Sequence, residues 1–269
     1  MGNSLEKIIA ISGATGFIGK NLSSYLTKTD IEHIQITRAE FNRKELILLP
    51  KCFCFVHLIG IGSKTSEKSF QQVNVKLTKK AIDICKKSKI KKFIYFSGLG
   101  VSKNSKSDYF ISKFDSEQLI INSGLDYTIF RPSYIIGKDD YLTLNIQKQI
   151  RQKKIWIPDA GQYVIQPITI NDACKIINIA TESKSFSKKI IDLVGPEKIP
   201  FKQFLKNSTS NSNVPIETIS VDDAYHKAST DRKFPYGIED LNILLGDFKG
   251  NYEKLKKLSG INFSKIRSI

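Results

Sequence analysis

The amino-acid sequence predicts an α/β fold, in which a doubly wound parallel sheet is joined to a smaller α/β lobe at the C-terminal end. Three observations predict it. Strand and helix patterns alternate along the chain, as they do in parallel sheets with helices on both faces. A glycine-spaced turn joins the first strand to the first helix. The 269 residues suffice for one large α/β unit with a smaller lobe.

The first two strands are followed by a short crossover. We expect strands at 7–12 and 33–37, with a helix from about residue 16 to 26 between them. The next clear strand spans 53–59. Only residues 38–52 precede it, so the third strand of the usual doubly wound order is very short or missing there.

Four further elements complete the predicted core, which comprises residues 1–137. They are a helix over 67–87, a strand over 92–96, a helix over 109–122 and a strand over 127–131.

The pattern loosens after Gly137, and residues 138–269 are expected to form a smaller lobe for a substrate or a partner. Residues 164–195 are expected to return strands and a helix to the core. The elements predicted here are a helix over 141–153, a turn over 155–161, a strand over 164–168, a helix capped by Asn171 or Asp172, and a strand over 189–194.

The turn after the first strand reads Gly-Ala-Thr-Gly-Phe-Ile-Gly over residues 13–19. Gly13 allows a tight turn, Gly16 allows the backbone to approach a pyrophosphate, and Gly19 allows the helix to pack on the strand. Backbone N–H groups at the helix N-terminus then point at the anion. The turn therefore predicts a dinucleotide site, formed by Gly13, Thr15, Gly16, Phe17, Ile18 and Gly19. The alternative is a tight turn without a ligand.

The formal net charge is +16, but only six of the 42 basic residues are arginine. Lysine lacks the planar guanidinium that recognises bases and phosphates, and aromatic and basic residues do not alternate. We therefore do not expect nucleic-acid binding. Most of the charge is interpreted as solvated surface, with an acidic protein partner or an anionic membrane surface left open.

Cysteines and apolar runs indicate an ordinary protein of a reducing compartment. None of the four cysteines forms a CxxC pair, so core packing is favoured over a metal site or a disulfide. No apolar run is long enough to span a bilayer, and no secretory leader is expected. The predicted location is cytoplasmic, with peripheral membrane association as the alternative.

Tyr109 and Lys113 lie four residues apart on a predicted helix and share a face. An ammonium near a phenol lowers its pKa, and such a tyrosine exchanges a proton with a carbonyl or alcohol. Tyr134–Lys138 and Tyr252–Lys256 have the same spacing. Tyr109 is distinguished by following the strand and the loop 97–101, which puts it at the carboxyl edge of the sheet. The alternative is a rim tyrosine beside a solvated lysine.

Several motifs together resemble the extended and atypical short-chain dehydrogenase/reductases, the NAD-dependent epimerase/dehydratase superfamily, with a Rossmann-type sheet. They are residues 13–19, His57-Leu-Ile-Gly60, Asn74, Phe93-Ile-Tyr-Phe-Ser97, Tyr109-Phe-Ile-Ser-Lys113 and Arg131-Pro-Ser133. Ser97-Gly-Leu-Gly-Val101, Gln166-Pro-Ile-Thr-Ile-Asn-Asp172 and Asp192-Leu-Val-Gly-Pro196 are most similar to the accessory nucleotide-binding subunit group of complex I.

The resemblance implies roles for individual residues. Tyr109 would be the proton donor or acceptor, while Lys113 would set its pKa and hold the nicotinamide ribose. Pro132 and Ser133 would lie near the nicotinamide, and Gly60 is expected along the cofactor.

One position departs from the family pattern. The Ser or Thr that binds the substrate carbonyl in catalytic members is here Leu99, so Ser97 or Ser102 would have to replace it. Loss of this donor would cost on the order of a hundredfold in rate.

Arg38 follows the second strand where an acidic residue would hold the ribose diol of NAD. An arginine there can pair with the 2′-phosphate of NADP, so NADP(H) is the preferred cofactor and NAD(H) the second choice. The alternative is an exposed arginine that stacks on the adenine of either.

Two functions are consistent with the sequence. The first is an oxidoreductase or nucleotide-sugar epimerase/dehydratase that acts on an unidentified small molecule. The second is a non-catalytic, NADP(H)-binding structural or redox-sensing subunit of a larger complex. Leu99 favours the second function, and the Tyr109–Lys113 pair favours the first.

Overall fold

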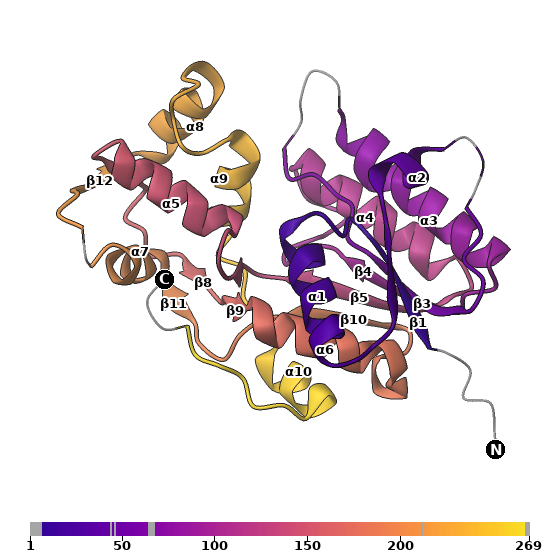
Figure 1. Cartoon of the computed structure of the whole chain (residues 1–269). Coiled ribbons are helices and arrows are strands. Elements are labelled where there is room, and N and C mark those ends of the chain that lie inside the picture. Colours follow the sequence, from indigo (N-terminus) through magenta and orange to yellow (C-terminus); the bar gives the residue numbers. More distant parts are fainter. Residues whose placement is uncertain (1–6, 44, 46, 64–67, 211, 267–269) are drawn as a thin grey trace.

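The structure is a computed structural model and describes residues 7–43, 45, 47–63, 68–210 and 212–266. Six strands form its central sheet, and every neighbouring pair runs parallel (Figure 1). In order across the sheet they are β10 (Lys189–Leu193), β5 (Asp126–Pro132), β4 (Lys92–Phe96), β3 (Cys52–His57), β1 (Ile8–Ser12) and β2 (His33–Ile36). The predicted doubly wound parallel sheet is confirmed.

The strand order reverses at β1, because β2 and β3 lie on its two sides. Such a switch point leaves a crevice at the carboxyl ends of the strands. The crossover from β2 to β3 contains only the short helix α2 (Arg38–Asn42), and the described part of residues 38–51 holds no strand. The expected missing third strand is thus confirmed for these residues.

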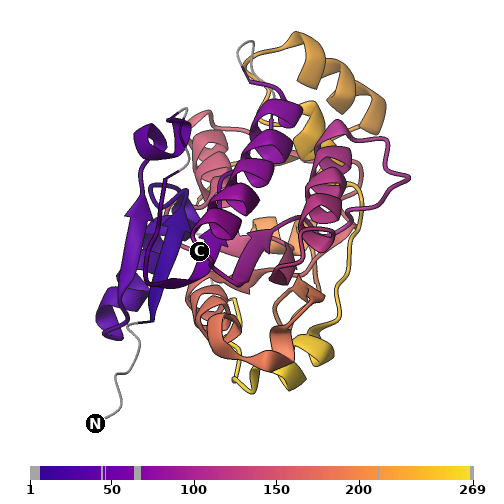
Figure 2. The same ribbon diagram turned by 90° about the vertical axis from the view of Figure 1, so that its right-hand side faces the viewer.

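Helices cover both faces of the sheet (Figure 2). On one face lie α1 (Phe17–Lys28) and α6 (Ile170–Glu182), and on the other lie α3 (Lys76–Lys87) and α4 (Asp108–Ile121). Side chains of a strand alternate between faces. In β1, Ile9 and Ile11 therefore join the core beneath α1 and α6, while Ala10 joins the core beneath α3.

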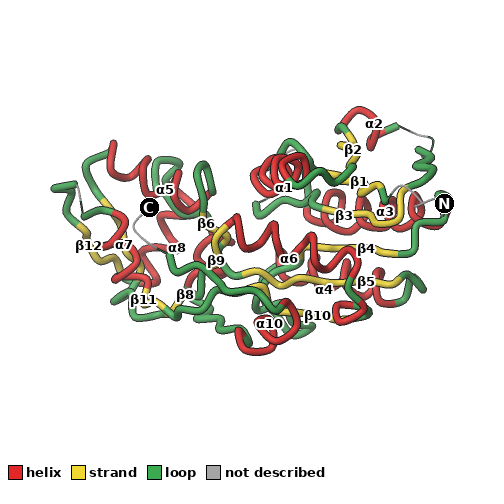
Figure 3. Tube along the Cα trace, turned by 60° about the horizontal axis from the view of Figure 1, so that its bottom comes forward, coloured by secondary structure: helices red, strands yellow, loops and turns green. Residues whose placement is uncertain are grey.

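A smaller lobe lies beyond the carboxyl ends of the strands (Figures 1 and 3). Its elements are α5 (Tyr141–Arg151), β7 (Ile155–Pro158), β8 (Val164–Ile165), β11 (Ile199–Pro200), α7 (Phe201–Ser208), β12 (Ile216–Ile219), α8 (Val221–Thr230) and α9 (Ile238–Leu244). Phe201 and Trp156 belong to its separate apolar core.

Several predicted boundaries of this second half are wrong. The first part of the predicted turn 155–161 is a strand, because β7 pairs with the distant β12. In place of the strand predicted over 164–168, the structure has two short strands, β8 and β9 (Ile168–Thr169). Strand β9 pairs with β6 (Ile135–Ile136). Helix α6 is capped by Thr169, whose hydroxyl accepts from the Asp172 backbone N–H at 3.1 Å.

Two helices differ from expectation in extent or place. The helix predicted over 67–87 begins with a π-helical turn, Gln71–Val75, that leads into α3, and residue 67 lies outside the described residues. The last helix, α10 (Tyr252–Ser259), returns to the core instead of staying with the lobe, because Leu255 packs fully buried beneath the sheet. No helix formed by the described residues has the length and apolarity needed to cross a membrane.

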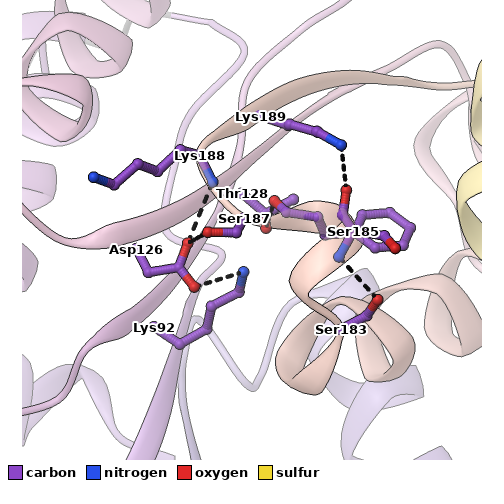
Figure 4. Close-up of polar contacts among 9 residues, drawn as sticks. Lys92, Asp126, Thr128, Ser183, Ser185, Ser187, Lys188 and Lys189 are labelled. Carbon is purple, nitrogen blue, oxygen red and sulfur yellow. Dashed lines mark hydrogen bonds and ion pairs between the residues drawn. The ribbon is translucent and has the colours of Figure 1, made fainter.

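Polar contacts fasten the amino ends of β5 and its neighbours (Figure 4). The Asp126 carboxylate accepts from Lys92 Nζ at 3.4 Å and from the hydroxyl of Ser187, which follows the 3₁₀ turn Lys184–Phe186. Thr128 donates to the Phe186 carbonyl at 2.7 Å. These bonds fix the edge strand β10 from the end opposite the carboxyl crevice.

Candidate functional site

The turn between β1 and α1 needs two of its glycines for packing. Gly13 has a φ of +76°, and a Cβ there would lie 2.9 Å from the Leu58 carbonyl carbon. A Cβ on Gly19 would lie 2.3 Å from the Gly13 oxygen. A Cβ on Gly16 would meet only that same oxygen, at 3.3 Å. Close contacts within the protein therefore account for the glycines at positions 13 and 19, whereas the space beside Gly16 is largely open.

The other predicted residues of this turn divide between solvent and core. Thr15 is exposed and lines the adjoining cavity. Phe17 and Ile18 pack, partly buried, against the core beneath α1 and α6. What they offer to an anion is their backbone N–H groups in the first turn of α1.

A cavity of about 350 Å³ adjoins the glycine turn. Arg38, in the first turn of α2, and Gly60, after β3, also line it, and the described lining includes no carboxylate. Nearby Glu40 is engaged locally, because its carboxylate accepts from the Thr37 backbone N–H at 2.8 Å and the Thr37 hydroxyl at 2.7 Å. These hydrogen bonds lower the pKa of Glu40.

Tyr109 and Lys113 lie on α4, whose first turn is capped by Ser107. The buried Lys113 Nζ lies 5.9 Å from the Tyr109 ring centroid and donates to the Phe96 carbonyl at 2.9 Å. Burial raises the pKa of Tyr109 and Lys113 opposes this shift; burial also lowers the pKa of Lys113. The ammonium acts on the phenol in the predicted direction, but the expected net lowering of the tyrosine pKa is wrong, because desolvation outweighs it.

The two rival Tyr–Lys pairs lack this setting. Tyr134 and Lys138 flank the short strand β6, so helical spacing does not apply to them. Tyr252 and Lys256 lie on α10, where the Tyr252 ring packs edge-on against Phe263 with centroids 5.1 Å apart.

A second cavity, of about 180 Å³, is lined by Ser97, Leu99, Tyr109, Pro132 and Ser133. The Ser97 Oγ is buried and has no hydrogen-bond partner among the described residues. Leu99, which stands at the position of the carbonyl-binding Ser or Thr in the family pattern, contributes an apolar side chain to this wall.

Ser102, the other suggested substitute for Leu99, is exposed and accepts from the Asn104 backbone N–H at 3.2 Å. It does not line the described part of this cavity. Of the two candidate serines, Ser97 is therefore the one beside Tyr109.

The Lys113 ammonium lies between residues that line the two cavities. Gly60 lines the first, and a Cβ on it would lie 3.1 Å from Lys113 Nζ. Tyr109, whose ring lies beside the same ammonium, lines the second. The loop after β3 is held in place by Asn74, which accepts from the Ile61 backbone N–H at 2.9 Å and donates to the Ser112 hydroxyl at 3.0 Å. Asn74 thus braces the fold.

Sequence reasoning missed residues that the lobe contributes. Phe248 lines the second cavity, and Glu239 accepts a hydrogen bond from the Ser107 hydroxyl at the start of α4. Neither lies in a recognisable motif. The glycines at 246 and 250 around Phe248 were the available signal of a close approach.

All four cysteines are buried and free, which confirms the core-packing interpretation. Burial raises the pKa of each thiol above its ordinary value, so the reactive thiolate is disfavoured.

Comparison with known proteins gives this geometry a context. Residues 53–166 match a family described as NAD(P)H-binding. Over 223 residues the chain is 25% identical to the mitochondrial NADH dehydrogenase [ubiquinone] 1 alpha subcomplex subunit 9 of Dictyostelium discoideum, a match that covers 74% of this chain and 62% of that protein. It is 42% identical over 132 residues to photosystem II assembly factor Ycf39 of Cyanophora paradoxa, covering 49% of this chain and 40% of the relative. The chain thus spans less than two thirds of these relatives.

Among solved structures, a nucleoside-diphosphate-sugar epimerase of Staphylococcus aureus superposes with a TM-score of 0.74 at 17% identity, covering 97% of this chain and 98% of that one. Identity at this level shows the fold. Fold, family match and homologues agree with the motifs read from the sequence. The chain has a Rossmann-type fold, its residues 53–166 match an NAD(P)H-binding family, and its relatives include subunit 9 of NADH dehydrogenase.

Proposed function

We propose that this protein is an NADP(H)-dependent reductase of a small carbonyl compound. The proposal depends on one observation: Tyr109 and Ser97 line the same cavity, and the buried Ser97 hydroxyl has no hydrogen-bond partner among the described residues. A buried hydroxyl without a partner is costly, and a substrate oxygen would satisfy it. Tyr109 would then give its proton to the oxygen that Ser97 holds.

The residues around the first cavity fit a dinucleotide. Open space above Gly16 and the N–H groups of α1 suit a pyrophosphate, and Arg38 suits a 2′-phosphate because the described lining has no carboxylate to repel it. Lys113, between the cavities, would hold the nicotinamide ribose and stabilise the tyrosinate. When bound, the coenzyme would supply the hydride.

The pKa shift of Tyr109 agrees with a role as proton donor. Burial raises the pKa of Tyr109 and so favours the protonated phenol, the form from which a proton donor starts.

A non-catalytic, NADP(H)-binding subunit of a larger assembly is the second candidate. It is favoured by Leu99, which removes the usual carbonyl donor, and by the homologous subunit of NADH dehydrogenase. In this case the Tyr109–Lys113 pair would serve only to hold the coenzyme. A peripheral membrane location would accompany this function.

Identification of the nucleotide that copurifies with the protein, by mass spectrometry under native conditions, tests the cofactor. Turnover is then followed at the nicotinamide absorbance with aldehydes, quinones and sugar nucleotides. Reduction that is abolished by Tyr109→Phe, with NADPH affinity retained, supports the reductase. Tight NADPH binding without turnover of any of these compounds supports the non-catalytic subunit.

A further inference from the structure

The cavity beside Tyr109 has a largely apolar wall. Among the described residues that line it, none is Lys, Arg, Asp or Glu, and most of its wall is aliphatic or aromatic. A nucleoside diphosphate needs cations or backbone donors at its phosphates. Its volume of about 180 Å³ is also below the roughly 300–1,000 Å³ of pockets that hold drug-sized ligands. Because Pro132 and Ser133 line the same space, a nicotinamide there would reduce it further.

Phe248 closes this cavity from the lobe. It follows α9 and packs edge-on against Phe110, with ring centroids 5.3 Å apart. Its ring lies between two glycines, since a Cβ would approach it to 2.5 Å at Gly100 and to 2.1 Å at Gly246. Any larger residue at these two positions would displace the ring. The ring therefore has one defined place in the wall.

The loop that carries Phe248 is held by hydrogen bonds on both sides of the ring. Before it, the Asp247 carboxylate accepts from the Val164 backbone N–H at 2.5 Å. After it, the Gly250 N–H donates to the buried Gln166 side chain at 3.0 Å, and the Asn251 N–H donates to Asp192, also at 3.0 Å. Hydrogen bonds on both sides make residues 247–251 a fixed wall.

We propose that the second cavity takes a small, uncharged and mainly apolar carbonyl compound, and that Phe248 sets the upper limit of its size. The proposal rests on the carbonyl reductase function for the carbonyl group, while the size and charge limits follow from the cavity wall. It excludes sugar nucleotides, despite the shared fold with their epimerases. Among the described residues that line the cavity, Ser97 supplies a buried, unpartnered hydroxyl, and the rest of the ligand would contact mainly apolar side chains.

The test measures dissociation constants by ligand-observed NMR for three probes: benzaldehyde, 2-naphthaldehyde and UDP-glucose. The protein is used with and without saturating NADPH. Wild type is compared with Phe248→Leu and with the control Phe263→Leu, which shortens a half-buried phenylalanine that packs on Tyr252 outside the cavity. Thermal unfolding checks that each variant is folded. Ile243→Ala, which also widens the cavity wall, is the second variant if Phe248→Leu does not fold.

In wild type, benzaldehyde is expected to bind more tightly than 2-naphthaldehyde, and UDP-glucose is expected to show no saturable binding. Phe248→Leu should shift the affinity ratio of the two aldehydes toward 2-naphthaldehyde by about tenfold or more, with Phe263→Leu unchanged. Tighter binding of UDP-glucose than of benzaldehyde overturns the proposal, as do a lack of benzaldehyde binding and an unchanged ratio in the cavity variants. Failure of NADPH to bind counts against the reductase function alone, because the aldehyde ratio without coenzyme still tests the cavity.

Discussion

Arg131 donates two hydrogen bonds to Glu117. Arg131 Nε donates to Glu117 Oε1 at 2.9 Å, and Arg131 Nη2 donates to Glu117 Oε2 at 2.6 Å. The Glu117 side chain is only 1% exposed, and the Arg131 side chain is 24% exposed. The pair joins α4, which carries Tyr109, to β5, which ends at Pro132. It thereby holds two walls of the second cavity in register.

Removal of the arginine should cost more stability than removal of the glutamate. Arg131→Ala leaves a buried carboxylate without a partner, and we expect a loss of about 3–5 kcal/mol in the free energy of unfolding by urea. Glu117→Ala should cost less, since the freed guanidinium is already partly solvated. Glu182→Ala, which breaks the exposed pair with Lys7, is the control and should cost less than about 1 kcal/mol. A reversed order of the first two variants would contradict this account.

The glycines of the first turn should separate into one for the fold and one for the ligand. Gly19→Ala places a Cβ 2.3 Å from a backbone oxygen, so it should destabilise the protein by about 1–3 kcal/mol or more. Gly16→Ala should cost about 1 kcal/mol or less. It should nevertheless weaken NADPH binding about tenfold or more, because its methyl group occupies the space expected for the pyrophosphate. Urea unfolding measures the stability of each variant, and calorimetric titration measures its NADPH affinity. Unchanged NADPH affinity in Gly16→Ala would contradict the assignment of the pyrophosphate to this turn.

Arg38→Ala should weaken NADPH binding more than NADH binding. Hydrogen bonds to a charged phosphate are worth about 1.5–3 kcal/mol, which corresponds to a loss of roughly 10- to 100-fold for NADPH. Arg43→Ala removes a similar charge from the C-terminal end of α2, outside the described cavity lining, and should change neither affinity much. Equal binding of both coenzymes by wild type would remove the inference of NADP preference.

His57 should make the protein less stable in mild acid. Its ring is fully buried, its Nδ1 lies 2.7 Å from the Ser12 hydroxyl, and burial together with the Lys113 charge lowers its pKa from 6.5 to about 3. Between these values the unfolded chain binds a proton that the native protein does not. The contribution of His57 is therefore complete above pH 6.5 and is lost as the pH falls toward 3, by up to about 1.4 kcal/mol per pH unit.

The variant His57→Gln keeps a polar partner for Ser12 and removes the titration. Urea unfolding between pH 7 and pH 4 should give a flatter stability profile for the variant than for wild type. Parallel profiles would show that other groups carry the acid sensitivity.

Much of the fold could be predicted from local patterns. Alternating strand and helix periods located the sheet, and the shortness of residues 38–52 identified the missing strand. The boundaries that failed depend on partners far away in sequence: residues 155–158 became β7 only because β12 pairs with them. Ile155, Trp156 and Ile157 are strand-forming residue types, but a run of three before Pro158 is too short to distinguish a strand from a turn without its partner.

The sequence by itself determined the parallel sheet, the glycine turn and the place of Tyr109 and Lys113 at the sheet edge, because glycine spacing and helical periodicity are local properties of the chain. Only the tertiary structure decided that burial, rather than Lys113, dominates the pKa of Tyr109, and that Phe248 lies beside it. Desolvation depends on everything that packs around a group. A cavity wall assembled from residues more than a hundred positions apart leaves no periodic trace in the chain.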